Sequence, residues 1–167
     1  MRLDMARKAF FSFHYKPDNW RASQVRNAGV LEGNTPVSDN DWEKVTSQGD
    51  DAIKKWIASQ LSGRSCAIVL VGTETASRKW VNYEIDEAWK KGMGVVGVHV
   101  HGLKDAGQNQ STKGSSPFIG HWVGLTQMSS IVKLYDTPYT SSTYVYDHIK
   151  ENLAAWVDEA CAIRSKY

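Results

Sequence analysis

The protein is a chain of 167 residues, of which 41% are hydrophobic and 23% charged, and its formal net charge at pH 7 is +2. This length and apolar content suit one folded domain, and no apolar run approaches the roughly 20 residues that a membrane-spanning helix needs. Because Lys and Arg are interspersed with Asp and Glu rather than clustered on one basic face, nucleic acid is not an expected partner.

The two cysteines, Cys66 and Cys161, are typical of a reducing compartment rather than of a disulfide scaffold. Residues 1–13 contain no apolar segment long enough for a signal peptide. We therefore expect a cytoplasmic protein that does not contact a membrane, with both cysteines in its core.

The first predicted strand runs from Lys8 to Phe13 and stops ahead of Pro17. Either Asp18 or Asn19 is expected to cap the helix that follows, and Gly29 is expected to end it. This first strand and helix predict the start of an alternating α/β chain.

The next segment is predicted to hold a very short strand at residues 30–31 and an exposed loop over 32–41, which is rich in Gly, Asn, Pro, Ser and Asp. Ser47 lies three residues before Asp50, a weak form of the capping box, and an apolar stripe then predicts a helix that ends at Gly63.

The most apolar run, Ser65 to Gly72, is predicted to be a fully buried strand, followed by an amphipathic helix over 77–92 and a second apolar strand from Gly94 to Val100. A polar loop over 102–116, a last strand over 131–135 and a closing helix over 143–164 complete the chain. This alternation predicts right-handed βαβ units, and so an α/β fold with a mostly parallel central sheet.

Glu84 is the misplaced residue of the helix over 77–92, because it projects between Trp80 and Ala88 inside the apolar face. A carboxyl group there is either held by a basic group or backbone N–H groups, or it is functional. A helix entered from the carboxyl end of a central strand borders the crevice in which open α/β sheets bind ligands. Glu84 is therefore a candidate catalytic residue.

Other polar and aromatic residues have weaker patterns. His14 lies between Phe13 and Tyr15, where a planar ring could be sandwiched, although a loop histidine held by the backbone would fit the same pattern. His99 and His101 could supply two metal ligands, but no third is predictable, so we interpret them as polar residues at the rim and expect no metal site.

The tryptophans divide into two groups. Trp56, Trp89 and Trp156 lie on apolar helix faces and are expected in the core, whereas Trp42 and Trp80 are the better pocket candidates. The chain has no P-loop, no G-x-G-x-x-G after the first strand, no C-x-x-C pair and no serine nucleophile elbow, which weakens kinase, NTPase, dehydrogenase and serine hydrolase interpretations.

Three motifs carry a resemblance to a known family. They are FFSFHY (10–15), the Trp42-Glu43 pair and SRKWVNYEI (77–85), and they resemble the strand-one turn and the W-x-x-x-E helix of TIR domains. The chain is more closely similar to the TIR-like proteins of bacterial Thoeris anti-phage defence, with which it also shares a Gly-Val-His strand at 97–99 and a K-G-x-x-P-F stretch at 113–118. The likeness spans most of the chain.

The resemblance implies a single TIR-like domain over 1–167, with a flavodoxin-like fold and helices on both faces of a mostly parallel sheet. It implies an enzyme, an NAD⁺ glycohydrolase and ADP-ribosyl cyclase, which releases nicotinamide and forms a cyclic ADP-ribose isomer as a second messenger. Glu84 takes the catalytic role, NAD⁺ is a substrate, and no separate cofactor is implied. The implied substrate-binding residues are Ser12, Phe13, His14, Tyr15, Trp42, Trp80 and Tyr83.

The partners implied by the resemblance are an effector protein that responds to the product, a phage component as trigger, and a second copy of the chain in a homo-oligomer. Two alternatives stay open. One is a non-enzymatic TIR interaction module, which would be favoured if Glu84 were exposed or locked in an ion pair. The other is an enzyme similar to nucleoside deoxyribosyltransferases, which also use a glutamate in a related fold.

Overall fold

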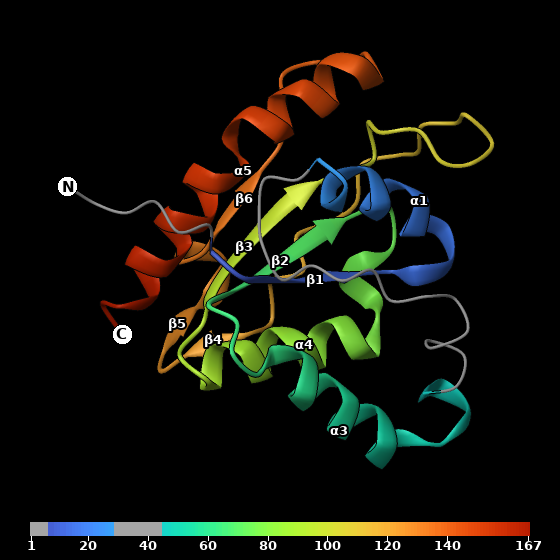
Figure 1. Ribbon diagram of the computed structural model, residues 1–167. Helices are drawn as coiled ribbons and strands as arrows, with labels where there is room; N and C mark the ends of the chain where they lie inside the picture. The colour runs from blue at the N-terminus through green and yellow to red at the C-terminus, as the bar shows by residue number, and fades with distance from the viewer. Residues whose placement is uncertain (1–6, 29–44) are drawn as a thin grey trace.

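The computed structural model describes residues 7–28 and 45–167. Its central sheet has the strand order β1-β2-β3-β6, and every described neighbour pair is parallel. These strands are β1 (Ala9–Phe13), β2 (Cys66–Val71), β3 (Gly94–His99) and β6 (Lys133–Tyr135). Helices lie on both faces of the sheet (Figure 1), so the predicted α/β, flavodoxin-like TIR architecture is confirmed.

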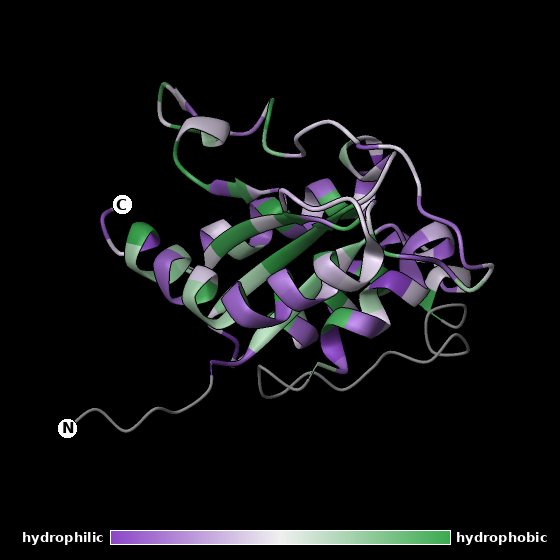
Figure 2. Ribbon diagram, turned by 90° about the horizontal axis from the view of Figure 1, so that it is seen from above, coloured by the Kyte–Doolittle hydropathy of each residue, from purple (hydrophilic) through white to green (hydrophobic). Residues whose placement is uncertain are grey.

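The side chains of each central strand alternate between two apolar layers. One layer packs the sheet against α1 (Tyr15–Arg26) and α5 (Ser142–Arg164), and the other packs it against α3 (Asp50–Leu61) and α4 (Lys79–Lys90). Because both faces are covered, every residue of β2 and β3 is buried, as the continuous apolar runs predicted. Figure 2 shows these strands as a hydrophobic band between helices with polar outer surfaces.

The helix α1 begins earlier than predicted, at Tyr15, with His14 as its N-cap and Pro17 inside its first turn. Proline is tolerated there because the N–H that it lacks would have no partner within the helix. Asp18 does not cap the helix, since it lies one turn further on, where its own N–H donates to His14 O at 3.1 Å. The prediction of Asp18 or Asn19 as the cap was therefore wrong.

The helix that carries Glu84 also differs slightly from the prediction. A short 3₁₀ helix, η1 (Thr75–Ser77), connects β2 to α4, and Arg78 is the N-cap of α4. The remaining predicted strands and helices have bounds within a few residues of those observed. The predicted strand at 30–31 and loop at 32–41 lie outside the described residues.

The segment before β6 contains structure that the sequence did not predict. A small antiparallel hairpin joins β4 (Trp122–Val123) and β5 (Thr126–Gln127), and η2 (Met128–Ser130) follows it. Buried Phe118 packs in the layer below α4, whereas Leu125 at the hairpin turn is 98% exposed. Each strand of this hairpin is only two residues long, which is too short for an alternating apolar pattern to be recognised in the sequence.

Most of the residues that were predicted to lie in the core are buried there or pack against the buried core residues. Cys66 is buried and Cys161 half-buried, and both are free thiols. Trp156 is 8% exposed, while Trp56 and Trp89 are half-buried against the layer that contains α3 and α4.

Two glycines allow close packing at the carboxyl end of β2. A Cβ on Gly72 would lie 2.1 Å from Asp18 Oδ2, and a Cβ on Gly114 would lie 2.0 Å from the backbone oxygen of Gly72. Residues at both positions are therefore limited to glycine by the space available rather than by backbone conformation.

Candidate active site

Glu84 lies on the face of α4 that packs toward the sheet, and it is only 4% exposed. Its Oε2 atom has no hydrogen-bond partner, and no Lys, Arg or His within the described residues lies in salt-bridge range of the carboxyl group. The ion-paired arrangement that a purely structural glutamate would adopt is therefore not found among residues 7–28 and 45–167.

Burial raises the pKa of Glu84 to about 8, because a charged carboxylate is poorly solvated there, and nearby Ser12 offsets part of the increase. Ser12 is 1% exposed, and its Oγ has no hydrogen bond of good geometry within the described part of the chain. Two adjacent buried polar groups without full partners are unusual for a packed core and typical of a site that a ligand completes.

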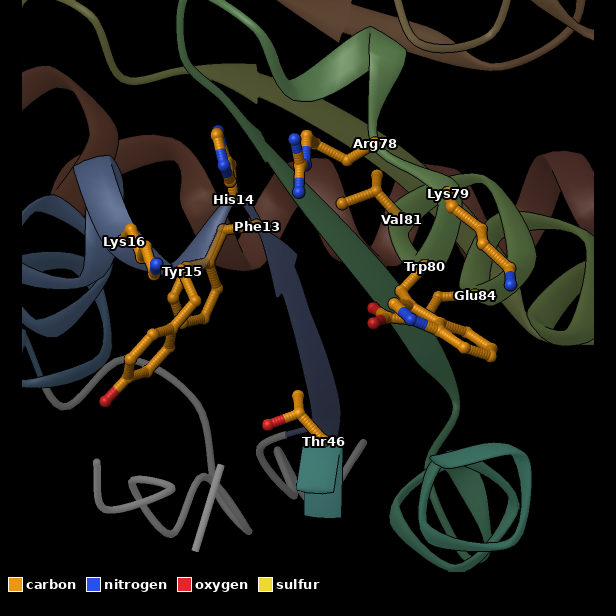
Figure 3. A pocket seen from close by; sticks show the side chains of 10 residues that line it. All are labelled: Phe13, His14, Tyr15, Lys16, Thr46, Arg78, Lys79, Trp80, Val81 and Glu84. Carbon is orange, nitrogen blue, oxygen red and sulfur yellow. The ribbon is translucent and has the colours of Figure 1, made fainter. Parts of the chain in front are cut away.

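A cavity of about 410 Å³ opens beside Glu84. It lies at the carboxyl end of β1, between the first turns of α1 and α4, which is where parallel α/β sheets bind ligands. Figure 3 shows the side chains that line it: Phe13, His14, Tyr15, Lys16, Thr46, Arg78, Lys79, Trp80, Val81 and Glu84.

Aromatic rings form much of the wall around the carboxyl group. The rings of Phe13 and Tyr15 are stacked with centroids 6.1 Å apart, and Trp80 lies across the cavity beside Glu84 (Figure 3). A smaller recess of about 30 Å³ continues from the same carboxyl group toward Arg26 and Trp56. Apolar walls lower the local dielectric and offer surfaces for a planar ring.

The structure brings together most of the residues predicted for substrate binding. Phe13, His14, Tyr15 and Trp80 line the cavity. Ser12 lies next to Glu84.

Ser12 and Tyr83, which were also predicted to bind substrate, are not among the residues that line the cavity. Tyr83 packs edge-on against Trp80, with ring centroids 5.6 Å apart, and so supports the wall from outside. Trp42 lies outside the described residues.

Sequence reasoning missed the basic side chains of the cavity wall, which belong to Lys16, Arg78 and Lys79. They are exposed residues in the first turn or at the N-cap of α1 and α4. The available signal was their position directly after predicted strands or at predicted helix starts, since such residues converge at one edge of a parallel sheet.

A second polar cluster, separate from the cavity, lies at the end of β3. His99 is 4% exposed, its ring lies 5.5 Å from that of His101, and burial lowers the pKa of His99 to about 4. Lys113 and Asp136 form an ion pair nearby at 2.9 Å. Within the part of the chain that the structure describes, no group of three or more His, Cys, Asp or Glu residues could hold a metal ion.

Polar contacts on the far side of α4 fix its position. His121 bonds to Asp86 Oδ1 through Nδ1 at 2.7 Å and to Asn82 Oδ1 through Nε2 at 2.8 Å. The Asn82 amide in turn donates to Ala76 O and to Arg78 O, both at 3.0 Å. These bonds connect the hairpin segment, α4 and the turn before it, so Glu84 lies on a firmly held helix.

The parallel sheet, the W-x-x-x-E helix beside its carboxyl edge and the buried glutamate define a TIR-like domain. Comparison with known proteins agrees, because a sequence profile described as "Thoeris protein ThsB, TIR-like domain" matches residues 10–105. The chain belongs to this family of TIR-like Thoeris proteins.

One curated relative extends the comparison. A protein of Bacillus cereus (strain MSX-D12) named "Putative cyclic ADP-D-ribose synthase ThsB1" is 36% identical over 119 residues, which are 68% of this chain and 62% of the relative. The match thus spans less than two thirds of that relative.

No helix within residues 7–28 and 45–167 is both long enough and apolar enough to cross a membrane.

Proposed function

We propose that this protein cleaves NAD⁺ at the bond between nicotinamide and ribose and converts the ADP-ribose part into a cyclic isomer. The observation that carries the proposal is the buried, unpaired carboxyl group of Glu84 on the wall of a 410 Å³ cavity with stacked aromatic rings. The Bacillus cereus relative, named "Putative cyclic ADP-D-ribose synthase ThsB1", supports the same reaction.

The reaction needs little acid catalysis. When the glycosidic C1′–N bond breaks, its electron pair goes to the positively charged pyridinium nitrogen, and nicotinamide leaves as a neutral molecule. Ordinary glycoside hydrolysis needs a second carboxyl group to protonate its leaving group. One carboxylate is therefore sufficient here, which fits the presence of Glu84 without a neighbouring acid among the residues that line the cavity.

Glu84 would act on the ribose ring as positive charge develops at C1′. A carboxylate in an apolar surround stabilises this oxocarbenium-like state more strongly than the same group in water. Stabilisation is greater in the transition state than in the ground state, because the charge moves from the nicotinamide ring onto the sugar beside Glu84.

The raised pKa of Glu84 fits this role. In the empty cavity the proton is retained near neutral pH, which limits the cost of a buried charge. Binding of the positively charged nicotinamide ring favours the ionised carboxylate, since a nearby opposite charge lowers a carboxyl pKa. Substrate binding would thus ionise the group that the reaction requires.

The product depends on what reaches C1′ first. Attack by water gives linear ADP-ribose and a proton, whereas attack by a folded-back adenine or ribose group gives a cyclic product and a proton. The rings of Phe13, Tyr15 and Trp80 would favour cyclisation by excluding water from the reacting face.

We further propose that the cyclic product is a signal for an effector protein in anti-phage defence, with a phage component as trigger. NAD⁺ is the substrate, and the proposal requires no separate cofactor. A role limited to protein interaction would suit an exposed or ion-paired Glu84, and this carboxyl group is 4% exposed and without an ion-pair partner among the described residues.

The test is incubation of the purified protein with NAD⁺, with nicotinamide and ADP-ribose products separated by chromatography and identified by mass spectrometry. The proposal expects nicotinamide release with a cyclic ADP-ribose isomer, and loss of both in Glu84→Gln. Deoxynucleosides are offered in a parallel assay. If the chain were a deoxyribosyltransferase, it would turn over these deoxynucleosides and not NAD⁺. Because a trigger is part of the proposal, the assay is repeated in lysate from phage-infected cells.

A further inference from the structure

Two helices begin at the edge of the cavity, and neither start is neutralised by its own cap. The helix α1 follows His14 and α4 follows Arg78, and neither N-cap side chain accepts a hydrogen bond from the first turn. Each helix is 12 residues long, so each brings a substantial partial positive charge to its start. Residues from both first turns line the cavity (Figure 3).

Full positive charges lie at the same two helix starts. Arg78 and Lys16 both line the cavity, and no carboxylate of the described residues lies within salt-bridge distance of either. Lys79 differs, because it forms an ion pair with Asp50 at 2.7 Å. In Figure 3 the guanidinium group of Arg78 lies beside His14 on one wall, and Lys16 lies next to Tyr15 on another.

The acidic groups near these cations do not balance them. The first turn of α4 contains no acidic residue, and that of α1 contains only Asp18, which is already paired with Arg21 at 2.8 Å. Glu74 is close enough to influence His14 but does not line the cavity. The acid that does line the cavity is Glu84, and its Oε2 atom has no hydrogen-bond partner among the described residues. This unpartnered buried oxygen indicates, independently of the helix starts, that a ligand completes the site.

We propose that the starts of α1 and α4, with Lys16 and Arg78, form a subsite for the diphosphate group of a dinucleotide. This inference rests on the proposed function and adds to it the recognition of the substrate's phosphates. Backbone N–H groups at a helix start bind phosphate oxygens directly. Arginine adds a planar pair of donors, which suits two adjacent phosphates better than a point charge does.

The geometry separates two tasks within one cavity. Glu84 and the aromatic rings hold the nicotinamide riboside end, and the basic helix starts hold the diphosphate. A nucleoside without phosphates would therefore reach Glu84 but lose the second set of contacts. Binding energy at this distant part of the substrate would also help to align the ribose with Glu84.

The first experiment compares two substrates on the unmodified protein. We expect kcat/KM for NAD⁺ to exceed that for nicotinamide riboside, which has the same scissile bond and no phosphate, by at least tenfold, the ratio expected for one lost hydrogen bond to a charged group. Equal values for the two substrates would overturn the subsite while leaving NAD⁺ cleavage intact.

The second experiment measures binding without turnover. Isothermal titration of Glu84→Gln protein with ADP-ribose is repeated after adding Arg78→Gln, Arg78→Lys or Lys16→Gln. We expect Kd to rise about tenfold or more for each Gln variant and less for Arg78→Lys, with a loss of salt dependence. Lys150→Gln on α5, an exposed lysine that does not line the cavity, is the charge-matched control and should bind as the parent does.

These outcomes distinguish the inference from the proposed function. If the protein binds ADP-ribose through Arg78 and Lys16 but releases no nicotinamide, the reaction is wrong and the subsite stands. If ADP-ribose does not bind, or binds equally to the Gln variants, the subsite is wrong. Circular dichroism confirms that each variant is folded, and the two-substrate comparison needs no variant at all.

Discussion

Asp18 and Glu84 are two buried carboxyl groups at the same edge of the sheet, and only one of them is satisfied. Asp18 is 2% exposed and accepts a hydrogen bond from Arg21 at 2.8 Å. Glu84 is 4% exposed and has an oxygen without a partner in the described chain. Burial raises the pKa of both groups, so burial and a shifted pKa do not by themselves identify a site.

The difference lies in what surrounds each group. Arg21 also donates to the backbone oxygens of Leu103, Pro17 and Asn109, at 2.9, 3.2 and 2.8 Å, so the Asp18 ion pair is part of a network that connects α1 to the loop after β3. Glu84 faces a cavity instead. A buried ion pair in a complete network is costly to break, whereas a buried carboxyl group that opens on a cavity is available to a ligand.

The largest expected effect tests the structural side of this comparison. Replacing Asp18 by Asn leaves the Arg21 charge buried, with Asp105 at 3.9 Å as its remaining ion-pair partner among the described residues. We expect the free energy of unfolding to fall by about 3 kcal/mol or more, measured by urea denaturation. Asp158→Asn, in the exposed pair with Arg7, is the control and should cost less than about 1 kcal/mol. A well-folded Asp18→Asn protein without NAD⁺ cleavage would instead make Asp18 part of the site.

The next effect tests the functional side. Glu84→Gln keeps the shape of the side chain and removes its charge, so nicotinamide release should fall by about 10²-fold to 10³-fold. Glu87→Gln is a matched control on the same helix, because Glu87 is half-exposed and pairs with Lys90 at 3.5 Å. Equal rates for Glu84→Gln and the unmodified protein would remove Glu84 from the mechanism.

The pH dependence sharpens the comparison further. Because the ionised form of Glu84 is the active one and its pKa is about 8, kcat/KM for NAD⁺ should fall about tenfold per pH unit below that value. Burial lowers the pKa of His14 from its ordinary value, so the His14 ring does not account for an inflection near pH 8. At saturating substrate the inflection should move to lower pH. A profile that is flat from pH 6 to 9 would contradict the assignment.

The smallest expected effect is on stability. Glu84 has a pKa of about 8 in the folded protein and an ordinary value of 4.5, so the folded state binds its proton more tightly. Its contribution to stability is present below pH 4.5 and is lost as pH rises through 8. Glu84→Gln should therefore become more stable relative to the parent as pH rises from 5 to 8, as differential scanning calorimetry at the two pH values would show. Destabilisation at pH 8 would mean that the carboxylate has an ion-pair partner.

Much of the fold could be predicted from the sequence, because its strands are continuous apolar runs and its long helices have clear apolar stripes. The position of Glu84 in such a stripe also identified the candidate site. The start of α1 could not be placed correctly, since Pro17 fits both a break before a helix and its first turn. The hairpin at β4 and β5 is too short to leave a periodic pattern.

The rest of the candidate site depends on distances between segments that are far apart in the chain. Arg78 and Lys16 are ordinary exposed residues when the sequence is considered alone, and they become notable only where α1 and α4 begin side by side. The same limit applies to Asp18, because a helical pattern cannot tell a carboxyl group with an arginine partner from one without. Trp42, a predicted substrate contact, stays a prediction.

Gly72 and Gly114 have a consequence for how this chain can diverge over time. Around them β2, α1 and the loop that carries Gly114 meet so closely that a single added methyl group would collide with Asp18 or with backbone. Side chains on the cavity wall face open space, so they can be exchanged without such a collision. A larger residue at Gly72 would first have to displace the buried Asp18 carboxyl group on α1, and one at Gly114 would have to displace the backbone of Gly72 and Thr73, so these two positions restrict divergence more than the cavity wall does.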